Sequence, residues 1–143
     1  MLVKELMSKN VITVGTEMSL KELGELFKQK RVSGFPVVSK DGNVVGIVTI
    51  TDMMRILGQI YELKESEKAH TDMQLSKMYE EEKAKAKVEN IMSKNVFILK
   101  ADDPMEEVMK MMFQQNVHTL PIADASGKLV GVIGRRDIIS ACF

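Results

Sequence analysis

Two hydroxyl groups and a carboxylate stand close together at the end of an apolar stretch in the first half of the chain. Residues 46–52 read Gly-Ile-Val-Thr-Ile-Thr-Asp, which predicts a buried strand that turns into a helix near Thr49, Thr51 and Asp52. A carboxylate can accept hydrogen bonds from both hydroxyls of a ribose, while threonine hydroxyls and helical N–H groups can bind a phosphate or a further sugar atom. The same residues are typical of helix capping, in which Thr51 or Asp52 accepts bonds from N–H groups of the first turn.

The carboxylate recurs 85 residues later, within a repeat that covers most of the chain. Residues 3–54 align without a gap on residues 88–139, with 14 identities in 52 positions, and Asp52 falls on Asp137. Composition alone would give roughly three or four identities over this length. Because the carboxylate returns at the same register, we favour ligand binding over capping alone.

Each copy predicts a β-α-β-β-α unit, which makes the fold class α+β. Glycine, proline and capping residues mark the turns and helix starts in both copies. In the first copy we expect strand 11–14, a helix opened by Ser19-Leu20-Lys21-Glu22, a strand beginning at Val37 and Val38, strand 44–49 and helix 52–57. In the second copy we expect strand 96–99, a helix opened by Asp103-Pro104, strands 120–123 and 129–133, and a helix from Asp137.

The repeat divides the chain into three parts: a first repeat over residues 1–58, a linker over 59–85 and a second repeat over 86–143. Residues 55–87 hold no proline and a single glycine, and they end in a run rich in Glu, Lys and Ala, which favours one or two helices over a flexible coil. A repeat of about 50 residues buries its sheet poorly alone. We therefore expect the two copies to pack face to face around a pseudo-twofold axis.

The composition excludes several classes of partner. The chain has 143 residues, of which 45% are apolar, and 20 basic residues balance 20 acidic ones, so no basic excess marks a nucleic-acid surface. No apolar run approaches the roughly 18 residues that span a membrane. The chain has a single cysteine, Cys142, and one thiol cannot form an internal disulfide or a structural zinc site. We expect a cytoplasmic protein without a metal ion and without nucleic acid or membrane as partner.

The order of the motifs resembles that of a cystathionine-β-synthase (CBS) domain pair, also called a Bateman module. The resemblance rests on the Met-Ser-x-Asn-Val start, the Val-x-x-x-Pro-Val segment and the Gly-Ile-Val-Thr-x-x-Asp ending, and it extends over both repeats. It implies a module that binds an adenosine-containing ligand, such as AMP, ADP, ATP or S-adenosylmethionine, in two clefts between the repeats. It also implies a disc-like homodimer that requires no cofactor.

In the first of these clefts, cleft A, the resemblance implies that the Thr-x-x-Asp end of the first repeat faces the second repeat. Asp52 would hold the ribose hydroxyls, and Phe97 and Val117 would flank the base. His118 resembles a phosphate-side histidine, although a surface or partly buried histidine without a ligand fits the sequence equally well. The residues implied for cleft A are Thr49, Thr51, Asp52, Met92, Phe97, Val117, His118 and Thr119.

The second cleft, cleft B, departs from the family pattern. Gly134, Arg135 and Arg136 replace the threonine-bearing segment of the first repeat, which puts the sugar and phosphate contacts in doubt. Either arginine could supply a charge-assisted phosphate contact instead, or both could be solvated surface residues. We therefore favour cleft A as the ligand site and keep cleft B as a second one. The residues implied for cleft B are Met7, Ile12, Val32, Ser33, Gly34, Arg135, Arg136 and Asp137.

The chain lacks the residue patterns of common enzymes. It has two histidines, His70 and His118, in no recognised nucleophile-base spacing, and it has no glycine-rich phosphate loop. We expect a regulatory module, not a catalyst, whose output passes to a separate effector protein. The alternative is a structural dimerisation module with empty clefts, which the twelve methionines fit as core or as a subunit seam.

Overall fold

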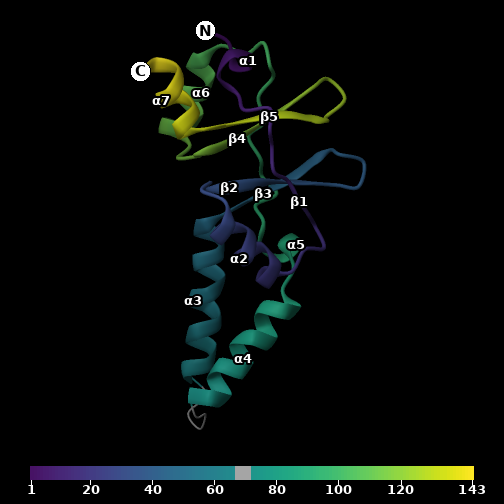
Figure 1. Ribbon diagram of the computed structural model, residues 1–143, viewed down its shortest axis with the longest axis vertical. Coiled ribbons are helices and arrows are strands. Elements are labelled where there is room, and N and C mark those ends of the chain that lie inside the picture. Colours follow the sequence, from purple (N-terminus) through teal and green to yellow (C-terminus); the bar gives the residue numbers. More distant parts are fainter. Residues whose placement is uncertain (67–71) are drawn as a thin grey trace.

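A computed structural model describes residues 1–66 and 72–143 of the chain. Two small β-sheets lie one above the other, and helices cover the outer face of each sheet (Figure 1). Both termini lie at the same end of the molecule (Figure 1). The elements are α1 (Val3–Leu6), β1 (Val14–Gly15), α2 (Leu20–Gln29), β2 (Gly34–Val38), β3 (Val44–Thr49), α3 (Ile50–Ser66), α4 (Asp72–Lys85), α5 (Val88–Ile91), α6 (Met105–Gln114), β4 (Thr119–Ala123), β5 (Leu129–Gly134) and α7 (Arg135–Cys142).

The first repeat forms a three-stranded sheet. Strand β1 runs parallel to β2, and β2 pairs antiparallel with β3. Helix α2 begins at Ser19, whose Oγ accepts the N–H of Glu22 at 3.1 Å, as the capping spacing predicts. The tight turn between β2 and β3 contains Gly42 at φ +85°, a left-handed conformation that glycine adopts without a steric penalty. Leu20 and Leu23 of α2 are buried in the core of this repeat.

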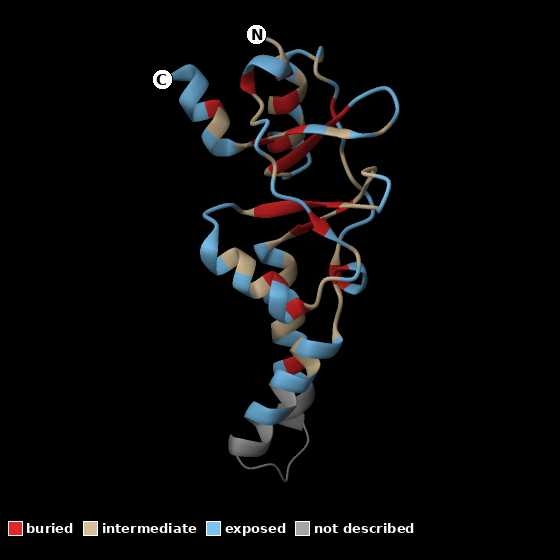
Figure 2. Ribbon diagram, turned by 45° about the vertical axis from the view of Figure 1, so that its right-hand side comes forward, coloured by how far each residue is buried: buried red, intermediate tan, exposed pale blue. Residues whose placement is uncertain are grey.

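The second repeat forms a two-stranded sheet, because its first predicted strand is reduced to a single bridge. Strands β4 and β5 pair antiparallel, and Leu99 forms one isolated parallel bridge with Ile122. Helix α6 covers this sheet with Val108 and Met112 buried in the core. Buried residues gather in both sheets and on the helix faces turned toward them (Figure 2).

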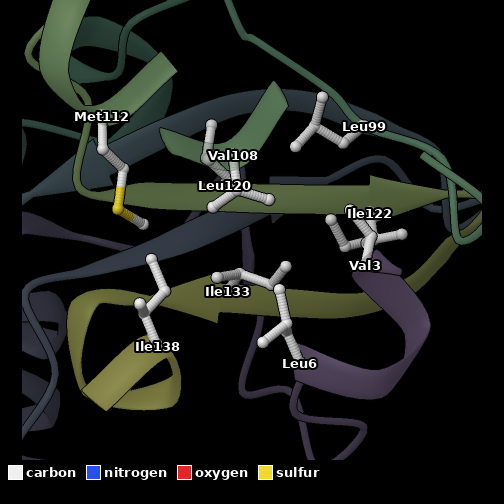
Figure 3. Packing of buried hydrophobic residues seen from close by; sticks show 9 residues of the cluster. All are labelled: Val3, Leu6, Leu99, Val108, Met112, Leu120, Ile122, Ile133 and Ile138. Atoms are coloured by element: carbon white, nitrogen blue, oxygen red, sulfur yellow. The ribbon is translucent and has the colours of Figure 1, made fainter. Parts of the chain in front are cut away.

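Each core is completed by a short helix from the other half of the chain. Val3 and Leu6 of α1 are buried in the second repeat's core, where Figure 3 shows them beside Ile122 and Ile133. Val88 and Ile91 of α5 are buried in the first repeat's core in the same way. The two short helices therefore exchange places between the repeats.

Reciprocal backbone contacts define the pseudo-twofold axis. Ser8 pairs with Val132, and Ser93 pairs with Ile47; each residue of the second pair lies 85 positions from its counterpart in the first. Asn43 forms a bridge with Lys128, and these two residues occupy equivalent positions in the two repeats. A contact between equivalent residues lies on the axis, so the two hairpin turns meet there. The predicted α+β fold with paired repeats is confirmed.

Several predicted boundaries were wrong. The predicted strand 11–14 is limited to Val14–Gly15, and residues 96–99 form no strand, because only Val14 of the first segment and Leu99 of the second pair with a neighbouring strand. Strand β2 starts at Gly34 and not at Val37, and α7 starts at Arg135 and not at Asp137. The sequence did not predict α1 or α5, because a four-residue helix is too short for a periodic pattern.

The predicted linker is helical on both sides of residues 67–71. Helix α3 runs without interruption from the end of β3 to Ser66, and α4 returns toward α5. Together they form an arm that extends away from the two sheets (Figure 1). The repeat boundaries 1–58 and 86–143 stay a prediction, since the exchange of α1 and α5 makes each core span both parts.

Candidate functional site

A cavity of about 330 Å³ lies between the two repeats, at the place predicted for cleft B. Both repeats contribute to its wall, and the lining combines apolar side chains, hydroxyls, arginines and one carboxylate. Its lining residues are Ser8, Asn10, Ile12, Arg31, Val32, Ser33, Gly34, Phe35, Pro36, Thr119, Val132, Gly134, Arg135, Arg136 and Asp137. This volume is near the lower end of the range for small-molecule sites.

The carboxylate of the cavity, Asp137, caps α7 with only one of its oxygens. Its Oδ2 accepts the N–H of Gly134 at 2.7 Å. Its Oδ1 makes no hydrogen bond with any residue of the described ranges 1–66 and 72–143. The capping and ligand-binding interpretations are therefore compatible for Asp137, because the second oxygen is available to a hydroxyl donor.

The equivalent carboxylate in cleft A, Asp52, uses both oxygens inside the protein. Its Oδ2 accepts the backbone N–H of Thr49 at 2.8 Å and the Thr49 hydroxyl at 3.1 Å. Its Oδ1 forms an ion pair with Arg55 at 3.0 Å, and the same Arg55 nitrogen also donates to the carbonyl of Ile91 at 3.3 Å. A ribose that binds Asp52 would therefore have to share Oδ1 with Arg55 or displace it, because each carboxylate oxygen has two lone pairs.

Of the residues predicted for cleft B, all but Met7 line the cavity. Met7 instead covers the strand β5: a Cβ added at Gly131 would lie 2.6 Å from the Met7 Sδ, so glycine is the residue that fits under the thioether. Ligand binding by these residues stays a prediction.

Thr119 was predicted in cleft A, but it lines the cleft-B cavity. Thr119 belongs to β4, which begins beside the pseudo-twofold axis, and its Oγ1 lies 3.1 Å from the Oγ of Ser33. This hydrogen bond joins the two repeats at the wall of the cavity. Its assignment to cleft A stays a prediction, because a residue next to the axis can border both clefts.

The remaining predicted residues of cleft A lie apart from this cavity. Met92 covers Gly46 as Met7 covers Gly131. Phe97 and Val117 are half-buried and pack against the core of the second repeat. His118 is also half-buried, and Thr51 is exposed. The preference for cleft A rested on its hydroxyls, but the cavity described above lies in cleft B.

The sequence analysis missed several lining residues, of which Arg31 carries charge. Arg31 directly precedes Val32, which was predicted for cleft B, and it follows the end of α2. Its position next to a predicted site residue could therefore have identified it as a lining residue. Ser8 and Asn10 belong to the repeated Met-Ser-Lys-Asn-Val motif, so they too could have been predicted as lining residues from the sequence. Phe35 and Pro36 lay just before the strand predicted to begin at Val37, and neither was given a role in a site.

In residues 1–66 and 72–143, no three His, Cys, Asp or Glu side chains are grouped so that they could hold a metal ion. Within these ranges no helix is both long and apolar enough to cross a bilayer.

Comparison with known proteins decides the family. The family model of the CBS domain matches residues 3–59 and 88–143. The chain belongs to the CBS domain family. The two matches fall on the two repeats, so the chain contains a CBS domain pair, as the sequence resemblance indicated.

Relatives of this CBS domain pair include proteins of quite different length. It is 30% identical to the uncharacterized protein MJ1426 of Methanocaldococcus jannaschii, in a match that covers 99% of this chain and 90% of that protein. It is 31% identical to the inosine-5'-monophosphate dehydrogenase of the same organism, in a match over 94% of this chain but only 22% of the enzyme. The match to the enzyme is thus confined to a minor part of its length.

Two solved CBS structures with ligands have the same fold. The CBS domain pair of protein MJ0100, in complex with 5'-methylthioadenosine and S-adenosyl-L-methionine, superposes with a TM-score of 0.76 at 26% identity and covers 99% of this chain and 94% of the other. CBSX2 in complex with AMP superposes with a TM-score of 0.74 at 25% identity, over 98% and 94% of the two chains.

Proposed function

We propose that this CBS domain pair is a regulatory module that binds an adenosine-containing ligand in cleft B and passes the signal to a separate effector protein. The observation that carries the proposal is the cavity that both repeats line, with the second oxygen of Asp137 available to a ligand. The adenosyl compounds bound to two similar CBS structures support the class of ligand. We propose a cytoplasmic location and no catalytic activity of the pair itself.

In this proposal different lining residues contact different parts of the ligand. Asp137 Oδ1 accepts a ribose hydroxyl, because a carboxylate oxygen is a strong acceptor. The apolar side chains of Ile12 and Val32 are 37% and 41% exposed, and they flank the base. The Ser33 and Thr119 hydroxyls, which already bond to each other, supply further polar contacts at the repeat interface.

The signal would arise because the ligand touches both repeats at once. A ligand that binds one relative tilt of the repeats more tightly than another shifts the population toward that tilt. The surface offered to the effector protein then changes with occupancy. Cleft A, with Thr49, Asp52 and the residues opposite them, is proposed as a much weaker second site, because its carboxylate is paired with Arg55.

The test is a thermal melt of the purified protein with AMP, ADP, ATP, S-adenosylmethionine and 5'-methylthioadenosine. At least one compound should raise the melting temperature in a dose-dependent way, since a ligand at 100 times its Kd stabilises the folded state by about 2.7 kcal/mol. Asp137→Asn should remove most of that rise. Asp52→Asn, the matched variant in cleft A, should retain most of it.

Other outcomes have definite meanings. If Asp52→Asn removes the rise and Asp137→Asn does not, cleft A is the ligand site and the assignment to cleft B is wrong. If the melting temperature is unchanged with every compound, the proposed ligand class is wrong and the structural alternative takes its place.

That alternative, a dimerisation module with empty clefts, has one observation in its favour. Phe113 on α6 is 78% exposed, Ile139 on α7 is 58% exposed, and Phe143 is fully exposed. Exposed apolar groups of this size on neighbouring helices favour contact with another protein. We propose that this face forms a homodimer, which is compatible with either function. Phe113→Ser should then shift the sedimentation coefficient from dimer toward monomer.

A further inference from the structure

The charge of cleft B is strongly asymmetric. Three of its lining residues are arginines, Arg31, Arg135 and Arg136, and its one acidic lining residue is Asp137. All three arginine residues are exposed as well as lining the cavity. None of them forms an ion pair with a residue in the described parts of the chain. The cleft therefore presents guanidinium groups that no carboxylate of the described chain neutralises.

This charge is specific to cleft B and is not a property of the repeat. At the positions shifted by 85 residues, Asn116 corresponds to Arg31, while Ile50 and Thr51 correspond to Arg135 and Arg136. None of these equivalents carries a charge. The one arginine at cleft A, Arg55, is already paired with Asp52. Two clefts with the same backbone plan thus differ in the ligand charge that they favour.

The arginines come from both repeats. Arg31 follows α2 of the first repeat, two residues beyond the last helical residue Gln29. Arg135 and Arg136 are the first two residues of α7 in the second repeat. An anionic group held by all three would therefore connect the first repeat to the second through charge-assisted hydrogen bonds.

Guanidinium groups of this kind favour phosphates. Arginine donates paired N–H groups in a planar fork that matches phosphate oxygens, and these bonds are shorter and stronger than neutral ones. The cavity is near the lower limit for a ligand site, so we expect the nucleoside part of a nucleotide to occupy it and the phosphates to extend toward the exposed arginines. S-Adenosylmethionine carries a sulfonium, an ammonium and one carboxylate, so its net charge is positive and it offers three unpaired arginines less negative charge than a phosphate chain does.

We propose that cleft B selects adenine nucleotides over S-adenosylmethionine, and that Arg31 joins Arg135 and Arg136 in binding the phosphate chain across the repeat interface. This inference rests on the proposed function, because it names the class of adenosyl ligand that the same site takes. It assigns a binding role to Arg31, which neither the repeat nor the hydroxyl pattern indicates.

The experiment is isothermal titration of the full chain with adenosine, AMP, ATP and S-adenosylmethionine at low salt. ATP and AMP should bind at least about tenfold more tightly than adenosine, since a hydrogen bond to a charged group typically contributes more than the free energy of one tenfold step. S-Adenosylmethionine should bind no better than adenosine. Added sodium chloride should weaken ATP binding and leave adenosine binding nearly unchanged.

Variants separate the arginines from the rest of the cleft. Arg31→Gln and Arg136→Gln should each weaken ATP binding about tenfold and leave adenosine binding within twofold. Lys110→Gln removes an exposed positive charge on α6 outside this cavity and should change neither affinity. The melting temperature of each unliganded variant checks that it is folded.

Three failures can be told apart. If adenosine, AMP and ATP bind with equal affinity, or if S-adenosylmethionine binds most tightly, the phosphate assignment is wrong while the proposed adenosyl function stands. If none of the four compounds binds to the folded protein, the proposed function itself is wrong. If Arg31→Gln binds ATP as the unmodified chain does, the role of Arg31 is refuted even where Arg136→Gln weakens binding.

Discussion

Asp52 and Asp137 occupy equivalent positions in the two repeats, yet their second carboxylate oxygens have different surroundings. Asp52 Oδ1 is paired with Arg55, whereas Ser140 stands at the position equivalent to Arg55 in the second repeat. The ion pair joins residues three apart on α3, a spacing that brings side chains together on a helix. A single residue therefore separates an occupied carboxylate from an available one.

Replacing that residue should make the two clefts more alike. In Arg55→Ser, Asp52 Oδ1 loses its partner and becomes available to a ribose hydroxyl, as Asp137 Oδ1 is. We expect titration calorimetry to show a second bound adenosine per chain in Arg55→Ser, where the unmodified chain binds one. A stoichiometry that stays at one in the folded variant would show that features other than Arg55 keep cleft A from binding.

The two capping aspartates also show how far residue patterns can be interpreted. The Asp52–Arg55 spacing was present in the sequence, and the helix predicted over 52–57 placed both residues on it, so the pairing could have been predicted. The residue patterns alone did not predict the cavity, which only the family resemblance implied, because the cavity depends on how residues such as Gly34 and Thr119 meet across the pseudo-twofold axis. No local pattern specifies the distance between two repeats that are far apart in sequence.

At the scale of elements, the exchange of α1 and α5 couples the stability of the two repeats. Leu6 lies in the N-terminal segment, but its side chain is buried in the core of the second repeat. Ile91, its equivalent, is buried in the core of the first repeat. The repeat in the sequence was found from identities alone, whereas this exchange was not, because four-residue helices have no periodic signal of their own.

Truncating these side chains should therefore act at a distance along the chain. Leu6→Ala and Ile91→Ala each leave a cavity in a packed core, which typically costs about 2–5 kcal/mol of unfolding free energy. In hydrogen exchange, Leu6→Ala should speed exchange in α6 and β4 more than in α2. Ile91→Ala should do the opposite, in α2 and β2. Faster exchange confined to residues next to the mutated position would contradict the exchange of helices.

At the scale of the whole molecule, the two hairpin turns and the cavity wall are two of the places where the repeats touch. Asn43 bridges Lys128 at the turns, and Ser33 bonds Thr119 at the wall. Residues 8–12 connect β5 of the second repeat to β1 of the first, and they contribute Ser8, Asn10 and Ile12 to the cavity. A bound ligand therefore contacts the connection between the repeats as well as the repeats themselves.

Ligand binding should consequently protect both halves together. With saturating ATP, we expect slower hydrogen exchange in residues 8–12, at the start of β2 and in the first turn of α7. Asp137→Asn under the same conditions should show much less protection in all three segments. Protection restricted to one repeat would contradict a ligand shared between them.

The exchange of α1 and α5 also determines what happens if the polypeptide is divided. A cut between Ser66 and Asp72 would give two fragments, each of which carries the short helix that the other fragment's core requires. Neither fragment can complete its own interior, but a mixture of both can. Co-expressed fragments should thus reconstitute one complex, whereas either fragment expressed alone should aggregate or be degraded. Splitting the chain here would turn a covalent pair into an obligate heterodimer.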